Sequence, residues 1–127
     1  MIVSIGTDII EVHRVREILA RTPRFIERVF TEAERAYCDS RPATSAQHYA
    51  VRFAAKEAML KALKTGWSGG LAWQDVEVCL LESGAPYIKL TGMALKLFRE
   101  AGATNIHLSM SHTAEHAVAH VVLERVE

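Results

Sequence analysis

The chain has few of the residues that mark a secreted, membrane or disulfide-rich protein. Its 127 residues include only two cysteines, Cys38 and Cys79, and their spacing matches no metal-binding motif. We expect free thiols in a reducing cytoplasm, with a single disulfide as the alternative. The N-terminus lacks a basic segment followed by a long apolar one, so no signal peptide is expected. No apolar run approaches the roughly 18 residues of a membrane-spanning helix.

An excess of charge of one sign is also missing. Lysine and arginine together number 15, as do aspartate and glutamate, so the formal net charge is +0. Bulk charge therefore gives no argument for binding nucleic acid, and electrostatic recognition requires a local patch. Half of the residues are hydrophobic, which is ordinary for a globular protein. The length predicts one domain, residues 1–127, with a buried core.

Periodicity predicts an α+β fold in which an antiparallel sheet packs against one long helix. The long helix should be closed by Gly66, with Lys61 and Lys64 in its last turns. Strands are predicted over 2–8, 74–81, 86–90, 105–111 and 116–124. Helices are predicted over 11–20, 25–30, 31–38, 45–64 and 92–101, the third beginning with a capping box at Thr31–Glu34.

Asp8 ends an apolar strand, where a carboxylate is costly to bury without a partner. One interpretation is an N-cap, in which Asp8 accepts backbone N–H groups of the next helix. The other pairs Asp8 with Glu57 of the long helix. Mg²⁺ usually takes one or two protein carboxylates and completes its octahedron with water and phosphate oxygens. Asp8 and Glu57 are therefore the candidate magnesium ligands.

Basic residues surround Glu57 on the long helix. Lys61 follows it by one turn, a spacing that also fits a solvated ion pair worth only about 0.2–0.5 kcal/mol. The alternative is that the basic side chains neutralise phosphate oxygens; they are Arg52, Lys56, Lys61 and Lys64. The glycine-rich loop over 65–70 could let backbone approach a ligand. It matches no phosphate-binding fingerprint and is equally typical of a simple connector.

The strand over 105–111 has a polar face. His107 and His112 lie five apart, so they face opposite sides of a strand and do not form a zinc pair. Ser109 and Ser111 accompany His107, but no G-x-S-x-G elbow is present, which argues against a Ser-His hydrolase. A structural polar edge and a ligand contact both fit this face.

Arginines recur along residues 11–28. Arg14, Arg21 and Arg28 follow each other every seven residues, and Arg24 lies between the last two. A solvated helix face is one interpretation of this pattern. The other is a docking surface for an acidic protein partner.

Together these segments resemble the holo-acyl-carrier-protein synthase family, the small bacterial 4′-phosphopantetheinyl transferases. The resemblance covers nearly the whole chain. Its strongest parts are Ile5-Gly6-Thr7-Asp8-Ile9, Arg52-Phe53-Ala54-Ala55-Lys56-Glu57-Ala58 and Ser109-Met110-Ser111-His112-Thr113. It implies the fold of that family and its reaction. The 4′-phosphopantetheine arm of coenzyme A is transferred to a serine of apo-acyl carrier protein, and adenosine 3′,5′-bisphosphate is released.

The resemblance also implies roles for individual residues. The catalytic set is Asp8, Lys56 and Glu57, with Asp8 and Glu57 holding Mg²⁺. The coenzyme A-binding set is Arg52, Lys61, Lys64, Thr65, Gly66, Pro86 and His107, in which Pro86 approaches the adenine and Arg52 and His107 the 3′-phosphate. The carrier-protein set is Arg14, Arg21 and Arg24. Neutralising the diphosphate with a metal and lysines agrees with what such a transfer requires. The base that accepts the serine proton is Glu57, Asp8 or a metal-bound water.

Finally, the resemblance implies a homotrimer with active sites between subunits. The composition predicts a cytoplasmic protein, with no nucleic-acid or membrane partner expected. The departures from the family pattern are minor: Trp67 is bulky for its loop, and His116 stands where an aromatic residue is common. Two other classes are the alternatives. One is a module that binds coenzyme A or a carrier protein without catalysis, against which the intact acidic and basic residues argue. The other is a structural oligomer with solvated charges.

Overall fold

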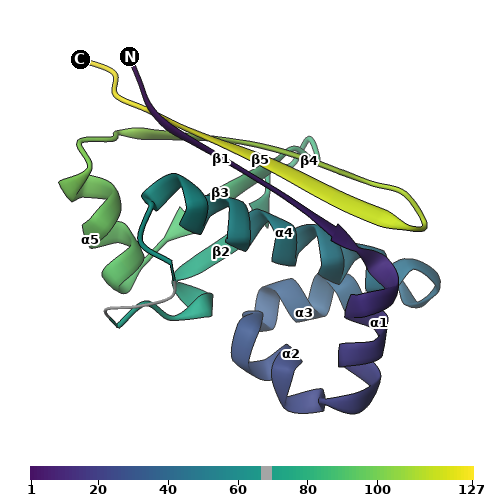
Figure 1. Cartoon of the computed structure of the whole chain (residues 1–127). Helices are drawn as coiled ribbons and strands as arrows, with labels where there is room; N and C mark the ends of the chain where they lie inside the picture. The colour runs from purple at the N-terminus through teal and green to yellow at the C-terminus, as the bar shows by residue number, and fades with distance from the viewer. Residues whose placement is uncertain (67–69) are drawn as a thin grey trace.

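The computed structural model describes residues 1–66 and 70–127, and it has the expected α+β architecture (Figure 1). Two short 3₁₀ helices, η1 and η2, accompany the helices and strands. The elements in chain order are β1 (Ile2–Glu11), α1 (Val12–Arg21), α2 (Pro23–Val29), α3 (Glu32–Asp39), η1 (Pro42–Thr44), α4 (Ser45–Leu63), η2 (Trp73–Asp75), β2 (Val76–Leu80), β3 (Pro86–Leu90), α5 (Gly92–Glu100), β4 (Asn105–His112) and β5 (His116–Glu124). The predicted fold class is confirmed.

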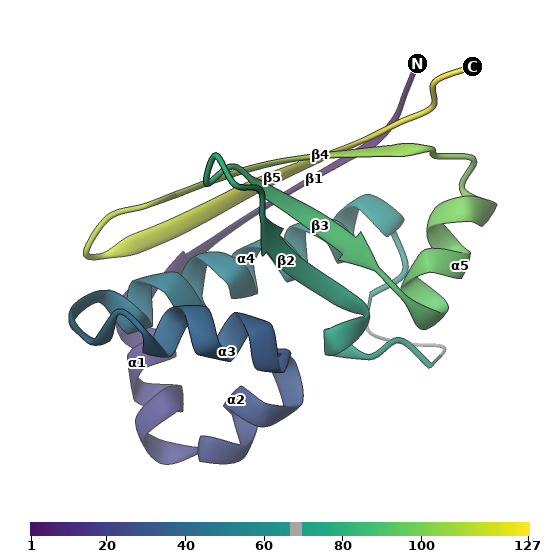
Figure 2. The same cartoon turned by 180° about the vertical axis from the view of Figure 1, so that it is seen from behind.

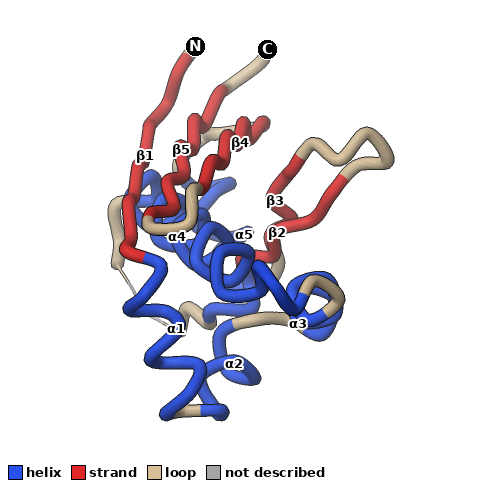
Figure 3. Tube along the Cα trace, turned by 90° about the vertical axis from the view of Figure 1, so that its right-hand side faces the viewer, coloured by secondary structure: helices blue, strands red, loops and turns tan. Residues whose placement is uncertain are grey.

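The strands form two antiparallel ladders rather than one sheet. A three-stranded sheet has the order β1-β5-β4, so β5 is central and β1 and β4 are its edges. The hairpin of β2 and β3 makes a separate ladder. It lies beside β4, on the side of the sheet away from β1 (Figure 3).

Helix α4 is the centre of the molecule. Its sequence is rich in alanine and leucine, and it is buried on nearly every side, as expected for a helix with apolar residues all round. The three-stranded sheet covers one side of α4, and α1–α3 lie on the other (Figure 1). Seen from behind, the β2–β3 hairpin covers a further side (Figure 2). The helix ends at Leu63, and its C-cap is Lys64, which takes the left-handed conformation (φ 64°). The prediction that Gly66 closes this helix is therefore wrong, because the chain already leaves the helix two residues earlier.

Strand β1 lies directly on α4 at Gly6. A Cβ atom added to Gly6 would stand 2.0 Å from the carbonyl oxygen of Ala58 and 2.8 Å from the amide nitrogen of Ala62. Such distances are far below van der Waals contact, so only glycine allows this approach. Because strand side chains alternate, Asp8 lies on the same side of β1 as Gly6.

The N-cap interpretation of Asp8 is wrong. β1 does not end at residue 8 but continues to Glu11, because its pairing with β5 runs on to the Glu11–His116 pair. Helix α1 begins at Val12, and its N-cap is Glu11, which makes no side-chain cap bond. The predicted capping box at Thr31–Glu34 is confirmed, with both reciprocal bonds present at the start of α3.

Among residues 1–66 and 70–127, no helix covers the outer face of the three-stranded sheet (Figure 3). Ile5 and Ile9 of β1 point outward and are each 68 % exposed. His107, His116 and His120 lie on exposed positions of the neighbouring strands. The exposed side chains of Ile5 and Ile9, next to these histidines, form a surface that another protein chain can cover.

Replacing Gly6 by alanine should destabilise the protein by about 3 kcal/mol, because β1 must move away from α4 to make room for the methyl group. Chemical denaturation at a fixed protein concentration measures the loss. Gly84→Ala is the matched control. It also replaces a glycine by alanine, at a position with φ 91°, but nothing lies within 4 Å of the added Cβ. The control should lose about 1 kcal/mol. An equal decrease in the free energy of unfolding for the two variants would show that the close contact between β1 and α4 does not contribute to stability.

Candidate functional site

Asp8 and Lys61 meet where β1 lies on the C-terminal half of α4. The Lys61 Nζ donates to Asp8 Oδ1 at 3.0 Å and to the Thr7 carbonyl oxygen at 3.1 Å. The Asp8 side chain is 16 % exposed and that of Lys61 is 56 % exposed. Glu57 is half-buried on α4, one turn before Lys61. The structure thus brings the two predicted carboxylates to one region.

The end of α4 extends this region toward solvent. Lys64 caps the helix, and Thr65 and Gly66 follow it on the exposed surface. The glycine-rich loop continues with Trp67, Ser68 and Gly69, which lie outside the described residues. Asp8, Glu57, Lys61, Lys64, Thr65 and Gly66 are called the β1-edge group from here on.

The chemistry of the β1-edge group fits a hard divalent cation that shares its coordination with a substrate. In the parts of the chain that the structure describes, no cluster of three acidic, histidine or cysteine side chains is arranged to hold a metal. Mg²⁺ needs only one or two protein carboxylates when phosphate oxygens and water supply the rest. Asp8 and Glu57 fit that requirement, with Lys61 beside them as a counter-charge for phosphate.

Lys56 is not brought together with Asp8. Its side chain is 0 % exposed, and its Nζ lies 2.9 Å from Glu34 Oε1 of α3. It also donates to the carbonyl oxygens of Val76 and Trp73. Burial lowers the pKa of Lys56, and the charge of Glu34 partly offsets that effect. Within one chain this ammonium ties α4 to α3 and β2.

Glu34 completes this buried network and was not among the predicted site residues. Its Oε1 accepts from the Thr31 backbone N–H and its Oε2 from that of Val78. The capping-box motif gave Glu34 a local role, but no sequence signal indicated a partner on α4, since Lys56 is distant in the chain.

Arg52 lies one turn before Lys56 and faces the β2–β3 hairpin. It is 2 % exposed, and its guanidinium carbon lies 4.2 Å from the centre of the Tyr37 ring. Its buried Nε has no hydrogen-bond partner among the described residues. Arg52 also lines a hollow of about 210 Å³ with Leu80 of β2. Because Leu80 pairs with Pro86 in the hairpin, Arg52 and Pro86 belong to one region.

His107 lies on the outer face of β4, where its Nε2 is 2.9 Å from Glu124 Oε1. His112, at the end of the same strand, instead contacts the ring of His48 on α4. Arg52, Pro86 and His107, called the β4-side group, thus come from α4, the hairpin and β4. Because β1 and β4 are opposite edges of the sheet, His107 lies at the other edge from Asp8, whereas Arg52 shares α4 with Glu57.

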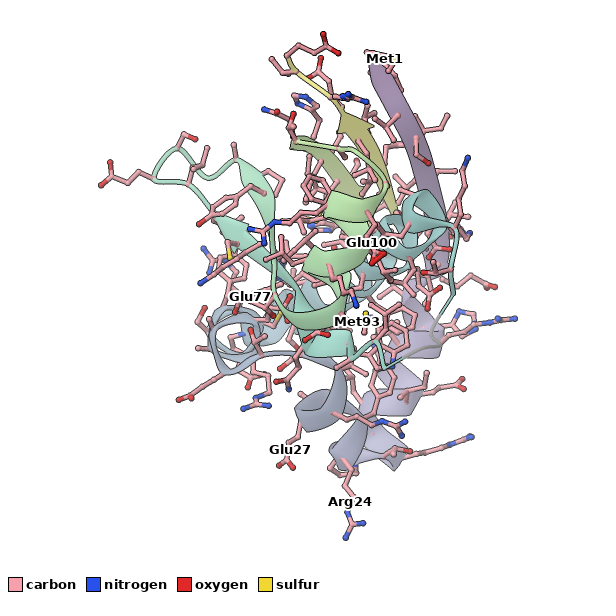
Figure 4. The ribbon with its side chains drawn as sticks, turned by 90° about the vertical axis from the view of Figure 1, so that its left-hand side faces the viewer. Met1, Arg24, Glu27, Glu77, Met93 and Glu100 are labelled. Carbon is pink, nitrogen blue, oxygen red and sulfur yellow. The ribbon has the colours of Figure 1, made fainter. Side chains whose placement is uncertain are left out.

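The predicted docking arginines are all exposed on α1 and α2. The Arg14 Nε lies 3.5 Å from Glu11 Oε1, and the Arg14 side chain is 70 % exposed. It lines a shallow hollow of about 280 Å³ with Ile9 and His116, at the end of β1. Arg21 closes α1. Arg24 points away from the body of the molecule (Figure 4).

Comparison with known proteins gives consistent matches along the chain. The family model described as the 4′-phosphopantetheinyl transferase superfamily matches residues 4–121. A holo-[acyl-carrier-protein] synthase of Geobacter sp. (strain M21) is 48 % identical over 126 residues, covering 98 % of this chain and 100 % of the relative.

Solved structures agree with these sequence matches. The holo-(acyl-carrier-protein) synthase of Bacillus anthracis, in complex with CoA (3′,5′-ADP), is 38 % identical with a TM-score of 0.81 and covers 99 % of each chain. That of Helicobacter pylori, in complex with coenzyme A, is 28 % identical with a TM-score of 0.80, covering 94 % of this chain and 99 % of that one.

None of the described helices has both the length and the apolar character needed to cross a membrane. The fold and the full-length matches lead to one assignment: this chain belongs to the 4′-phosphopantetheinyl transferase superfamily.

Proposed function

We propose that this enzyme transfers the 4′-phosphopantetheine group of coenzyme A to a serine of apo-acyl carrier protein in a Mg²⁺-dependent reaction in the cytoplasm. The observation that carries the proposal is the β1-edge group, in which Asp8 bonds to Lys61 one turn from Glu57. Complexes of coenzyme A with the relatives from B. anthracis and H. pylori support the substrate. The products are holo-acyl carrier protein and adenosine 3′,5′-bisphosphate.

Asp8 and Glu57 would hold the Mg²⁺, which when bound neutralises charge on the diphosphate of coenzyme A. Lys61 adds a second positive charge. Because its side chain is 56 % exposed, its ammonium can leave Asp8 and reach a phosphate oxygen. Lys64, Thr65 and Gly66 lie at the end of the same helix, where they would contact the phosphates.

The serine of the carrier protein must lose a proton as it attacks phosphorus. Asp8 and Glu57 are the carboxylates of this chain that could accept it. Positioning and charge neutralisation supply most of the catalysis in phosphoryl transfers, so the rigid contact between β1 and α4 serves the reaction directly.

Lys56 enters the proposal as a positioning residue. Its buried pair with Glu34, and its bonds to the carbonyls of Trp73 and Val76, fix the side of α4 opposite the β1-edge group. The helix that carries Glu57 and Arg52 is thereby held in one orientation. Removing one partner of a buried pair leaves an uncompensated charge, which is strongly destabilising.

The proposal includes a homotrimer with active sites between subunits. Its first support is that Asp8 and His107 lie on opposite edge strands of one sheet, which lets a site form when the edge of one subunit meets the other edge of a neighbour. The second support is the uncovered outer face of the sheet, with Ile5 and Ile9 each 68 % exposed.

Incubating the enzyme with apo-acyl carrier protein, coenzyme A and Mg²⁺ should add one phosphopantetheine group to the carrier protein, detected by intact mass spectrometry. EDTA should block the gain in mass, and excess Mg²⁺ should restore it. Asp8→Asn and Glu57→Gln should each lower kcat/KM by at least about a hundredfold, since each removes a charge that acts on the transferring phosphate.

The control for these variants is Glu100→Gln, at the exposed end of α5, which should keep full activity and the same denaturation midpoint. Failure to modify several carrier proteins would favour the non-catalytic binding module. A Glu57→Gln enzyme that stays active and is not inhibited by EDTA would refute the assignment of Glu57 as a Mg²⁺ ligand.

Two inactive variants should restore activity to each other if the site is shared between subunits. Asp8→Asn damages the β1-edge group and Arg52→Gln the β4-side group. In trimers co-expressed from both chains, about a quarter of the sites would combine two intact halves, and activity should approach that fraction of the wild type. Complementation requires mixed assembly, so separately purified variants combined without subunit exchange serve as the control. A co-expressed mixture that stays inactive would place both groups in one subunit's site.

Arg14→Glu should raise the KM for the acidic carrier protein by about tenfold or more, because like charges meet across the docking surface. Coenzyme A binding should change little. Arg99→Glu, an equal charge reversal on exposed α5, is the matched control. The wild-type KM should also rise with salt, since exposed charges are screened. Equal losses for the carrier protein and for coenzyme A would contradict a docking role for Arg14.

A further inference from the structure

The outer face of the three-stranded sheet has a histidine at its centre. His120 is exposed on β5, the middle strand (Figure 3), and it lies directly across from Thr7 on β1 and Ser109 on β4. Because strand side chains alternate, these three point away from α4, opposite to Asp8. The rows of the sheet on either side of them are apolar, and their members on β1 and β5 are Ile5, Ile9, Val118 and Val122.

The imidazole of His120 is held by Thr7. The Thr7 Oγ1 lies 2.9 Å from His120 Nδ1 and 3.2 Å from the Ala119 carbonyl oxygen. Because a hydroxyl has one hydrogen, both bonds form together only when Thr7 donates to the carbonyl oxygen and the Nδ1–H of His120 donates to Thr7. The neutral ring then has its free lone pair on Nε2, which is the atom that takes up a proton on acidification.

The other histidines of this face lie beside carboxylates. The Nε2 of His107 is 2.9 Å from Glu124 Oε1, and His116 lies across from Glu11 in the ladder of β1 and β5. A positive charge on either histidine is therefore close to a negative one. His120 makes no ion pair with a carboxylate among the described residues.

The strands beside His120 supply no charge to its imidazole. Its neighbours across the sheet, Thr7 and Ser109, are uncharged. The carboxylates of the same face belong to Glu11 and Glu124, each four residues further along its strand, which is roughly 13 Å. Helix α4 lies against the opposite face of the sheet (Figure 1). A proton on His120 therefore adds a positive charge that no side chain of its own subunit neutralises.

Covering this face changes the cost of that proton. In the proposed homotrimer the exposed isoleucines of β1 pack against neighbouring chains, and His120 at the centre of the same face is covered with them. Removing an imidazolium from water without a carboxylate partner is unfavourable. Symmetry brings the same residue from every chain, so charged copies also repel one another. The assembled form therefore binds fewer protons than the separated chains.

We propose that His120 is a pH switch for assembly: its protonation below neutral pH separates the subunits and thereby the two halves of the shared active site. This inference rests on the proposed function, because it takes the homotrimer as the active form. The direction follows from proton linkage, since acid favours the form that binds more protons. Three copies of His120 titrate in each trimer, so the association constant should fall at least about a hundredfold between pH 8 and pH 5.5.

Sedimentation equilibrium over a series of chain concentrations measures the association constant at each pH. Near the concentration at which it assembles at pH 8, the wild type should have three times the chain mass of 14.1 kDa. At pH 5.5 it should approach the mass of one chain, reversibly and with an unchanged circular-dichroism spectrum.

Three variants assign the response to one side chain. His120→Gln keeps a polar amide beside Thr7 and should stay assembled at both pH values. His120→Lys carries a lasting positive charge and should be separated even at pH 8. His13→Gln removes an exposed histidine of α1, and as the matched control it should respond to pH as the wild type does.

Turnover gives a second readout, because dilution separates assembly from effects of pH on the chemical step. At about pH 6 the specific activity of the wild type should fall as the enzyme is diluted, and that of His120→Gln should not. An association constant that does not change with pH, or a response that His120→Gln retains, would overturn the inference and leave the proposed trimer standing. A wild type that is a single chain at every pH would overturn both. A pH-responsive assembly that modifies no carrier protein would refute the proposed function and leave the switch in place.

Discussion

The contact between Gly6 and α4 is the constraint on which the site depends. With an added Cβ only 2.0 Å from the Ala58 carbonyl oxygen, β1 can lie against the helix backbone with no side chain between them. Asp8 follows on the same side of the strand, so its carboxylate reaches Lys61 at 3.0 Å. Ala58 and Ala62 contribute by being small. The position of the Asp8 carboxylate is therefore set by three small residues with no reactive side chain, and any widening of this contact moves Asp8 away from α4.

Two buried cations, one helical turn apart on α4, illustrate how a structural charge differs from a functional one. Lys56 has a carboxylate partner and carbonyl acceptors, so the cost of its burial is offset inside the fold. Arg52 is nearly as buried, yet its Nε has no partner among the described residues; another of its nitrogens donates to the His48 carbonyl oxygen at 3.3 Å, and its guanidinium lies over the Tyr37 ring. The fold needs the first ion pair in order to pack α3 and β2 against α4. Under the proposed function, Arg52 gains an anionic partner when coenzyme A binds.

Much of the fold could be predicted from the sequence because its signals are local. Helix α4 was predicted over 45–64 from its alanine-, leucine- and lysine-rich composition, and it spans Ser45–Leu63. The Thr31–Glu34 capping box is likewise a short-range pattern. The predictions were wrong where the structure depends on contacts between residues far apart in the sequence. β1 outlasts its predicted end because β5 continues to pair with it, and the lysine in the Lys56-Glu57 motif turns toward Glu34 because α3 folds back on α4. Tyr37 belongs to no motif, and only the tertiary structure brings its ring to Arg52.

In the proposed trimer, the division of the site between subunits ties activity to assembly. A single chain presents Asp8 and Lys61 at β1, and on α4 a guanidinium whose Nε has no partner among the described residues. Coenzyme A carries its diphosphate and its ribose phosphate on one molecule, so in this proposal one ligand engages groups from two chains. The exposed isoleucines on the outer face of β1 give such a meeting a hydrophobic driving force. A ligand that bridges two subunits also stabilises their association, because it binds the assembled form alone. Under the proposed function, substrate binding and oligomer formation are therefore thermodynamically linked, and each strengthens the other.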